Sequence, residues 1–269
     1  MEQDLTTGSV FKRIVYFSLP YLLSYFLQTL YGMADLFITG QFYGVDTITA
    51  VSNGSQIMHM MTVIIVGLAM GTTVTIGHSV GAKCMEQAEK IIGNTITLFM
   101  GIAVAFTVIL VVLVKPIVVL IAAPQEAVAG TSIYLLICFI GIPFITAYNI
   151  ISSIFRGLGD SKSPMYFIGI ACVMNIALDY LFMGAFHMGA AGAALGTVCA
   201  QTFSVLVALW VIRRRKTGIS LKKSDFKIER AVIGQVLKIG IPVALQDGFI
   251  QVAFMIITVI ANSRGVSDA

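Results

Sequence analysis

The chain has 269 residues, of which 58% are hydrophobic and only 11% charged, and its mean hydropathy is +0.93. Soluble proteins carry about 25% charged residues. This chain therefore lacks the polar surface of a soluble protein, and we predict a polytopic membrane protein. The net charge of +4 does not indicate a nucleic-acid partner, because the basic residues concentrate in the connections between apolar segments.

Seven apolar segments are each long enough to cross a hydrocarbon core about 30 Å thick, which takes roughly 20 helical residues. Helices are expected rather than barrel strands, because the segments are about twice the length of a strand and show no strict alternation. We therefore predict an all-α membrane fold. The segments are residues 14–39, 52–77, 91–114, 130–154, 165–185, 190–212 and 233–260.

Lysine and arginine are concentrated in alternate connections between these segments. One set of connections holds only Lys115 and Arg264, so the other set holds 15 of the 17 basic residues, including the dense run from Arg213 to Arg230. Cytoplasmic loops are the ones enriched in basic residues. The distribution predicts a cytoplasmic amino terminus.

Two aspartates lie inside apolar segments, each five residues before a glycine: Asp35 before Gly40, and Asp179 before Gly184. A carboxylate at membrane depth costs roughly 2.5–3.5 kcal/mol on insertion scales, so it usually marks an ion, proton or substrate site. The matched spacing predicts that both carboxylates lie at a similar depth. Asn175 is four residues before Asp179 and shares its helix face, and a carboxylate beside an amide oxygen suits a proton or Na⁺.

Other polar residues and prolines in the segments are weaker candidates. Thr197 and Gln201 are four residues apart and could add oxygen ligands or bond a neighbouring helix. Asp247 in the last segment could be a gate or substrate contact, or it could reach interfacial water. Proline frees a backbone carbonyl and permits a bend, so the prolines that interrupt segments are candidate hinges. These are Pro20, Pro143 and Pro242.

The seventh segment resembles the first. Phe17-Ser18-Leu19-Pro20 is echoed by Ile239-Gly240-Ile241-Pro242, and the two prolines lie 222 positions apart. Because an even number of helices precedes the second copy, it has the same orientation as the first, a parallel repeat of the kind found in transporters. We predict a six-helix lobe at 1–212, a basic cytoplasmic inter-lobe loop at 213–232, and the first helix of a truncated second lobe at 233–269.

An enzyme is not expected, because the sequence has no metal-ligand cluster, phosphate loop or nucleophile triad. Gly157-Leu158-Gly159-Asp160 matches a pattern of intramembrane aspartyl proteases, but Arg156 and Lys162 bracket it and place it in a cytoplasmic turn. A paired-acid catalyst needs both carboxyl groups close together at one depth. Asp160 is predicted on the opposite side of the membrane from Asp35 and Asp179.

Four stretches carry a family resemblance. They are Tyr31-Gly32-Met33-Ala34-Asp35, Gly81-Ala82-Lys83 with Ala88, Arg156-Gly157-Leu158-Gly159-Asp160 with Pro164, and Asn175-Ile176-Ala177-Leu178-Asp179. With them, the sequence resembles the multidrug and toxic compound extrusion (MATE) transporters, in the bacterial and archaeal branch related to DNA-damage-inducible efflux proteins. The resemblance extends over all 269 residues, and we expect the second lobe to be missing after its first helix.

The resemblance implies secondary active multidrug efflux. Two six-helix lobes would open alternately to either side of the membrane and export amphiphilic, often cationic compounds in antiport with H⁺ or Na⁺. The implied partners are those compounds, the lipid bilayer and the second lobe, which is absent here and required for a full transporter. No cofactor is implied beyond the coupling ion. The implied location is the cytoplasmic (inner) membrane of a prokaryote, as a multi-pass protein.

The resemblance also implies which residues couple the cation. These are Asp35, Asn175 and Asp179, with Na⁺ as one candidate ion, while Thr197 and Asn149 match other polar positions that line the lobe. The alternative function is a lipid or lipid-linked-sugar flippase of the same superfamily. A flippase would favour basic residues in its cavity, whereas the charges embedded here are acidic.

Overall fold

The computed structural model describes residues 9–214 and 221–263. Within these residues the chain forms helices and no strand, which confirms the all-α prediction. The helices are α1 Val10–Phe42, α2 Val45–Gly81, α3 Met85–Leu120, α4 Gln125–Ile140, α5 Ile142–Gly157, α6 Lys162–Asp179, α7 Gly189–Arg214 and α8 Arg230–Ser263, with a π-helix η1 at Tyr180–Ala185 and a 3-10 helix η2 at Lys223–Phe226. Part of the predicted loop 213–232 and the end of the predicted helix region 233–269 lie outside the described residues.

Hydropathy supports six of the seven predicted membrane spans. Five of the described helices are long and apolar enough to cross a membrane, namely α2, α3, α6 together with η1, α7 and α8, and the bent pair α4 and α5 makes a sixth. Helix α1 is not among them, because polar residues such as Gln28 and Asp35 interrupt its apolar run. With 33 residues and about 1.5 Å of rise per residue, α1 is nevertheless longer than a bilayer core is thick.

The prolines behave differently from one another. The predicted segment 130–154 is two helices, α4 and α5, which meet at 53° around Gly141. Pro143 lies in the first turn of α5. Backbone N–H groups in a first turn have no intrahelical partner, so the N–H that proline lacks costs the helix no hydrogen bond. Helices α1 and α8 continue through Pro20 and Pro242, so the predicted interruption is wrong at these two sites. Their role as hinges stays a prediction.

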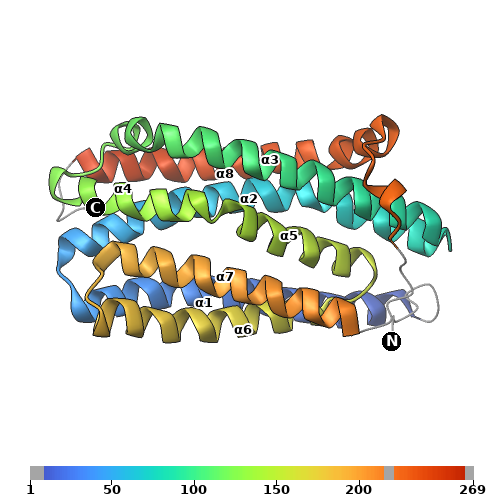
Figure 1. Ribbon diagram of the computed structural model, residues 1–269, viewed down its shortest axis with the longest axis horizontal. Coiled ribbons are helices and arrows are strands. Elements are labelled where there is room, and N and C mark those ends of the chain that lie inside the picture. Colours follow the sequence, from blue (N-terminus) through green and yellow to red (C-terminus); the bar gives the residue numbers. More distant parts are fainter. Residues whose placement is uncertain (1–8, 215–220, 264–269) are drawn as a thin grey trace.

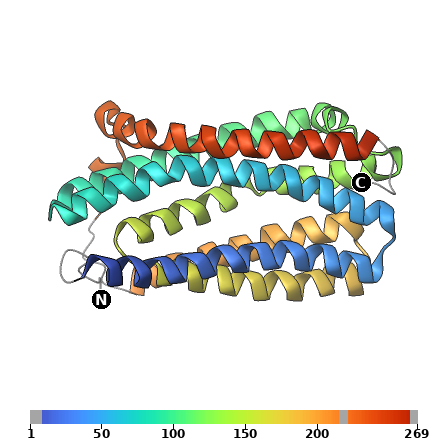
Figure 2. The same ribbon diagram turned by 180° about the vertical axis from the view of Figure 1, so that it is seen from behind.

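The helices lie side by side along the long axis of the molecule (Figures 1 and 2). Helices α1, α6 and α7 pack together on one side and α2, α3 and α8 on the other, while α4 and α5 contact both α2 and α7 between them. Helices α1 and α8 begin at the same end of the bundle and run in the same direction (Figure 1), as expected for corresponding helices of a parallel repeat. The division into lobes itself stays a prediction.

Small residues bring α8 and α2 into backbone contact. A Cβ atom on Gly71 of α2 would lie 2.0 Å from the carbonyl oxygen of Val236 in α8, and one on Gly240 of α8 would lie 2.3 Å from the carbonyl oxygen of Leu68 in α2. Small residues at helix interfaces permit this close approach in membranes. Helix α8 is therefore packed tightly against α2.

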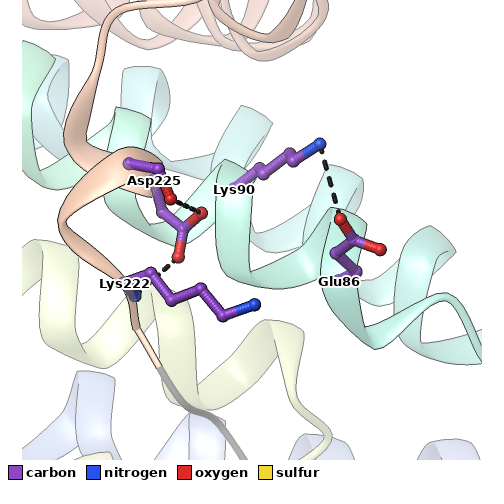
Figure 3. Close-up of polar contacts among 5 residues, drawn as sticks. Glu86, Lys90, Lys222 and Asp225 are labelled. Carbon is purple, nitrogen blue, oxygen red and sulfur yellow. Dashed lines mark hydrogen bonds and ion pairs between the residues drawn. The ribbon is translucent and has the colours of Figure 1, made fainter.

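The segment that leads into α8 is held against α3 (Figure 3). Asn94 of α3 donates from Nδ2 to the carbonyl oxygen of Asp225 (3.1 Å), and its Oδ1 accepts from the backbone N–H of Glu229 (2.7 Å). Gly93 lies beneath η2, since a Cβ there would be 2.4 Å from the same carbonyl oxygen of Asp225. The Asp225 carboxylate in turn accepts from the N–H of Lys222 (2.7 Å). Side chains of α3 thus fix the segment that leads into α8, since Thr97 also donates from Oγ1 to the carbonyl oxygen of Phe226 (2.9 Å).

Replacing Asn94 with alanine is expected to loosen this segment. The change leaves a backbone carbonyl and a backbone N–H without their partner, and an unsatisfied buried group costs about 1–3 kcal/mol. For a loss of about 2 kcal/mol, the Tm of the purified chain should fall by roughly 4–8 °C. Glu86→Ala, which removes an exposed side chain of the same helix, is the control and should leave Tm almost unchanged. Equal Tm values for the two variants would contradict the anchoring role.

Candidate cation and substrate site

Four of the predicted site residues come together where α1, α6 and α7 meet. Asp35 lies on α1, Asn175 and Asp179 on the last turns of α6, and Thr197 on α7. The two carboxyl groups adjoin, with Asn175 beside them. Thr197 donates from Oγ1 to Oδ2 of Asp35 (3.3 Å). The sequence could place only Asn175 and Asp179 on one face, and the packing of three helices adds the other two residues.

The polar atoms of this cluster are largely unpaired. Asp35 is 2% exposed, Asn175 1% and Asp179 0%. Among the described residues, no hydrogen-bond partner is found for Oδ1 of Asp35, for either carboxylate oxygen of Asp179, or for the side-chain amide of Asn175. Buried polar groups in proteins nearly always have partners, and buried charges need compensation. The cluster therefore has the oxygen atoms to hold a proton or a hard cation.

The backbone changes its geometry directly after Asp179. The π-helix η1 begins at the next residue, and π-helical turns are frequent at functional sites. Tyr43, just beyond α1, ties this turn in place: its hydroxyl donates to the carbonyl oxygen of Met183 (3.1 Å) and accepts from the N–H of Gly189 (2.9 Å). Sequence reasoning missed the π-helix and the Tyr43 bonds that hold it. The π-helix could not be predicted, because no pattern of residue types separates it from an α-helix.

A cavity of about 340 Å³ lies beside Asp35. Asn149, Thr197 and Gln201 line it together with Asp35, whereas Asn175 and Asp179 are not among the described residues that do. Its volume is within the range of small-molecule pockets. Asp35 therefore stands between the cavity on one side and the fully buried Asp179 on the other.

The cavity also contains residues that the sequence analysis did not select. Ser55 and His59 come from α2 and Tyr134 from α4, and the hydroxyl groups of Ser55 and Tyr134 are 3.0 Å apart. A signal was present in the sequence: Ser55, His59 and Thr62 recur at spacings of four and three residues in an otherwise apolar helix, which places them on one face. Asn149 bonds its own helix, donating from Nδ2 to the carbonyl oxygen of Ile145 (2.8 Å).

Asp247 lies apart from the paired acids. It lines a second cavity of about 130 Å³, where Arg156 and Tyr21 are also exposed to the space. The Arg156 guanidinium lies 5.3 Å from the Tyr21 ring centroid and donates to Oγ of Ser153 (3.0 Å). The structure does not bring Asp247 to the Asp35 cavity, and its role as a gate or substrate contact stays a prediction.

The turn that resembles the protease pattern has a structural role. Asp160 accepts from the backbone N–H groups of Lys162 and Ser163, each at 3.0 Å, at the start of α6. Asp179 is at the opposite end of that helix, roughly 25 Å away at 1.5 Å per residue. The two carboxyl groups are therefore too far apart to act as a catalytic pair.

A bundle of membrane-length helices with paired buried acids beside a ligand-sized cavity is typical of a membrane transporter. The comparisons with known proteins agree. The MatE family profile matches residues 20–181, so the chain belongs to the MATE transporter family. The members of this family are membrane transporters and not enzymes.

Relatives and solved structures support this assignment. Probable multidrug resistance protein YpnP of Bacillus subtilis is 33% identical over 263 residues, which is 97% of this chain and 58% of YpnP. Multidrug export protein MepA of Staphylococcus aureus is 26% identical over 240 residues, 88% of this chain and 53% of MepA. The chain therefore spans about half the length of these curated relatives.

The fold agrees with solved structures of MATE proteins. A MATE structure in the bent conformation has a TM-score of 0.88 and 25% identity, covering 98% of this chain and 59% of that one. A multidrug resistance MATE family transporter of the MOP superfamily, in its outward-facing conformation, has a TM-score of 0.84 and 26% identity, covering 91% of this chain and 54% of that one. These similarities confirm the family resemblance of the sequence.

Proposed function

We propose that this chain forms the first lobe, and the first helix of the second lobe, of a secondary active multidrug exporter. The whole transporter would expel amphiphilic, often cationic compounds in exchange for H⁺ or Na⁺ by alternating access. It would lie in the cytoplasmic membrane of a prokaryote with its amino terminus in the cytoplasm. The names of YpnP and MepA support multidrug export as the activity.

The position of Asp35 is the observation that carries this proposal. Its carboxyl group lines the larger cavity and adjoins Asp179, which is 0% exposed. A cation in the cavity and a coupling ion at the acid pair would therefore compete for the same carboxylate. Antiport requires such competition, because a ligand shifts an equilibrium only through its differential affinity for two states.

The proposed cycle follows from charge. Two unit charges about 4 Å apart repel by about 4 kcal/mol at an effective dielectric constant of 20, so two adjoining carboxylates favour uptake of a proton or Na⁺. Binding of one ion from outside cancels one of the two negative charges at Asp35 and Asp179, lowers the affinity of the cavity for a cationic compound, and lets the first lobe repack. Asn175 and Thr197 supply further oxygen atoms for the ion.

The flippase alternative predicts a different cavity. A carrier of anionic lipid headgroups would place basic residues where the substrate binds, whereas no lysine or arginine is among the described residues that line the larger cavity. Arg156 lines only the smaller one. The charge of the larger cavity therefore favours export of cationic compounds.

Ethidium efflux from cells tests the proposal. The 269-residue chain is compared with a two-lobe form, extended at its carboxyl end by the unmatched remainder of YpnP, and with Asp35→Asn in that form; MepA is the positive control. We expect efflux from the two-lobe form, loss of efflux in Asp35→Asn, and no efflux from the short chain. Efflux that survives Asp35→Asn would contradict cation coupling at this residue. No efflux from either wild-type form would favour the flippase, with lipid translocation as the next assay.

A further inference from the structure

Gly196 on α7 faces the Asp179 carboxylate across the contact between α6 and α7. A Cβ atom on Gly196 would lie 2.1 Å from Oδ1 of Asp179, 3.3 Å from its Cγ, and 3.7 Å from Nδ2 of Asn175. Contacts of a Cβ atom below 3.0 Å do not occur in real structures. Any larger residue at this position would therefore need the space that the carboxylate occupies.

The group that would have to move is the end of a side chain and not a backbone segment. Both oxygens of Asp179 lack hydrogen-bond partners among the described residues, so no hydrogen bond to the protein holds the carboxylate against displacement by a side chain at Gly196. The next residue, Thr197, donates to Asp35. Consecutive residues of α7 thus contact both members of the acid pair.

We infer that Gly196 is a positioning residue for the coupling ion, because its missing side chain lets the Asp179 carboxylate lie against α7 beside Asp35. The inference rests on the proposed cation coupling. From α1, the titratable group facing Asp179 is Asp35, while α7 presents Gly196 and Thr197, neither of which titrates. In Gly196→Ala the helices can keep their packing, but the carboxylate is displaced and the ion loses part of its ligand set.

The test measures ion binding by the purified 269-residue chain. A ligand that binds only the folded state raises Tm by mass action, so Tm is followed against Na⁺ concentration at fixed pH and against pH at fixed Na⁺. Gly196→Ala is expected to raise about tenfold the ion concentration at which Tm begins to rise, and Asp179→Ala to abolish the rise. Gly101→Ala, whose Cβ would meet nothing within 4 Å, is the matched control and should titrate like the wild type.

A double mutant separates positioning from a general packing defect. In the Asp179→Ala background the carboxylate is gone, so adding Gly196→Ala should not lower Tm further. If Gly196→Ala still lowers Tm in that background, the inference is overturned. An unchanged onset concentration in Gly196→Ala, with the rise abolished by Asp179→Ala, would also overturn it while leaving the proposed function intact. A wild-type chain with no ion-linked shift, or a shift that survives Asp179→Ala, would contradict the proposed ion site and this inference together.

Discussion

Asp179→Asn is expected to reduce drug efflux by the two-lobe form about 5-fold to 150-fold while leaving the chain folded. Asparagine has the shape of a neutralised aspartate, so the variant would remain in the ion-loaded state and lose the response to the ion. Coupling between two ligands is typically worth about 1–3 kcal/mol, or about 5-fold to 150-fold in affinity, and removing it should reduce ethidium efflux by a factor in that range.

Stability should move in the opposite direction from activity. The Asp179 carboxylate is fully buried, has no hydrogen-bond partner among the described residues, and adjoins Asp35. Removing a charge from such a site relieves repulsion and desolvation, so the Tm of the purified Asp179→Asn chain should equal or exceed that of the wild type. Functional sites often carry this kind of stability cost.

The control for this experiment is Asp46→Asn, which makes the same chemical change on an exposed residue at the start of α2. It should affect neither efflux nor Tm appreciably. If Asp179→Asn instead lowered Tm along with efflux, Asp179 would be a structural carboxylate that holds neighbouring helices together. That result would contradict its role in cation coupling.

The sequence predicted the fold class and the members of the acid cluster because both depend on local regularities. Apolar runs of spanning length predicted the helices, and the helical period placed Asn175 beside Asp179. The apposition of Asp35 followed from the family resemblance and from equal spacing to a glycine. In the structure Asp35, Asn175 and Asp179 lie together, while their role in coupling stays a prediction.

Features that depend on tertiary packing could not be predicted in this way. The break between α4 and α5 falls at Gly141, two residues before the predicted hinge Pro143, but the need for a glycine there appears only in the packing, because a Cβ would lie 2.5 Å from Val198 of α7. The proximity of Gly196 to Asp179 could not be predicted, since it requires the register between α6 and α7. Continuous helix through Pro20 and Pro242 likewise shows that a proline permits a break without requiring one.

Gly71→Ala is expected to separate α8 from α2. The new Cβ would lie 2.0 Å from the carbonyl oxygen of Val236 and 3.0 Å from the backbone nitrogen of Gly240. Unlike a carboxylate, a helix backbone cannot rotate away from such a contact, so the whole helix must shift. Overpacking of this kind costs typically about 1–3 kcal/mol, and the Tm of the purified chain should fall accordingly.

The separation of α8 from α2 can be measured directly near the far end of their interface. Thr258 of α8 donates to the side chain of Gln56 in α2, so cysteines at these two positions should be joined by a short bifunctional thiol cross-linker. Gly71→Ala should slow that cross-link. Gly248→Ala, whose Cβ would make an ordinary 3.7 Å contact with Ile64, is the control on this interface and should cross-link at the wild-type rate.

A second substitution distinguishes helix separation from a local defect. Gly240→Ala alone should also lower Tm, because its Cβ would lie 2.3 Å from the carbonyl oxygen of Leu68. If Gly71→Ala has already moved α8 outward, adding Gly240→Ala should lower Tm by less than Gly240→Ala does alone. The effects of substitutions that share one interface are not additive. Fully additive losses of Tm would mean that each alanine is accommodated locally and that α8 stays in place on α2.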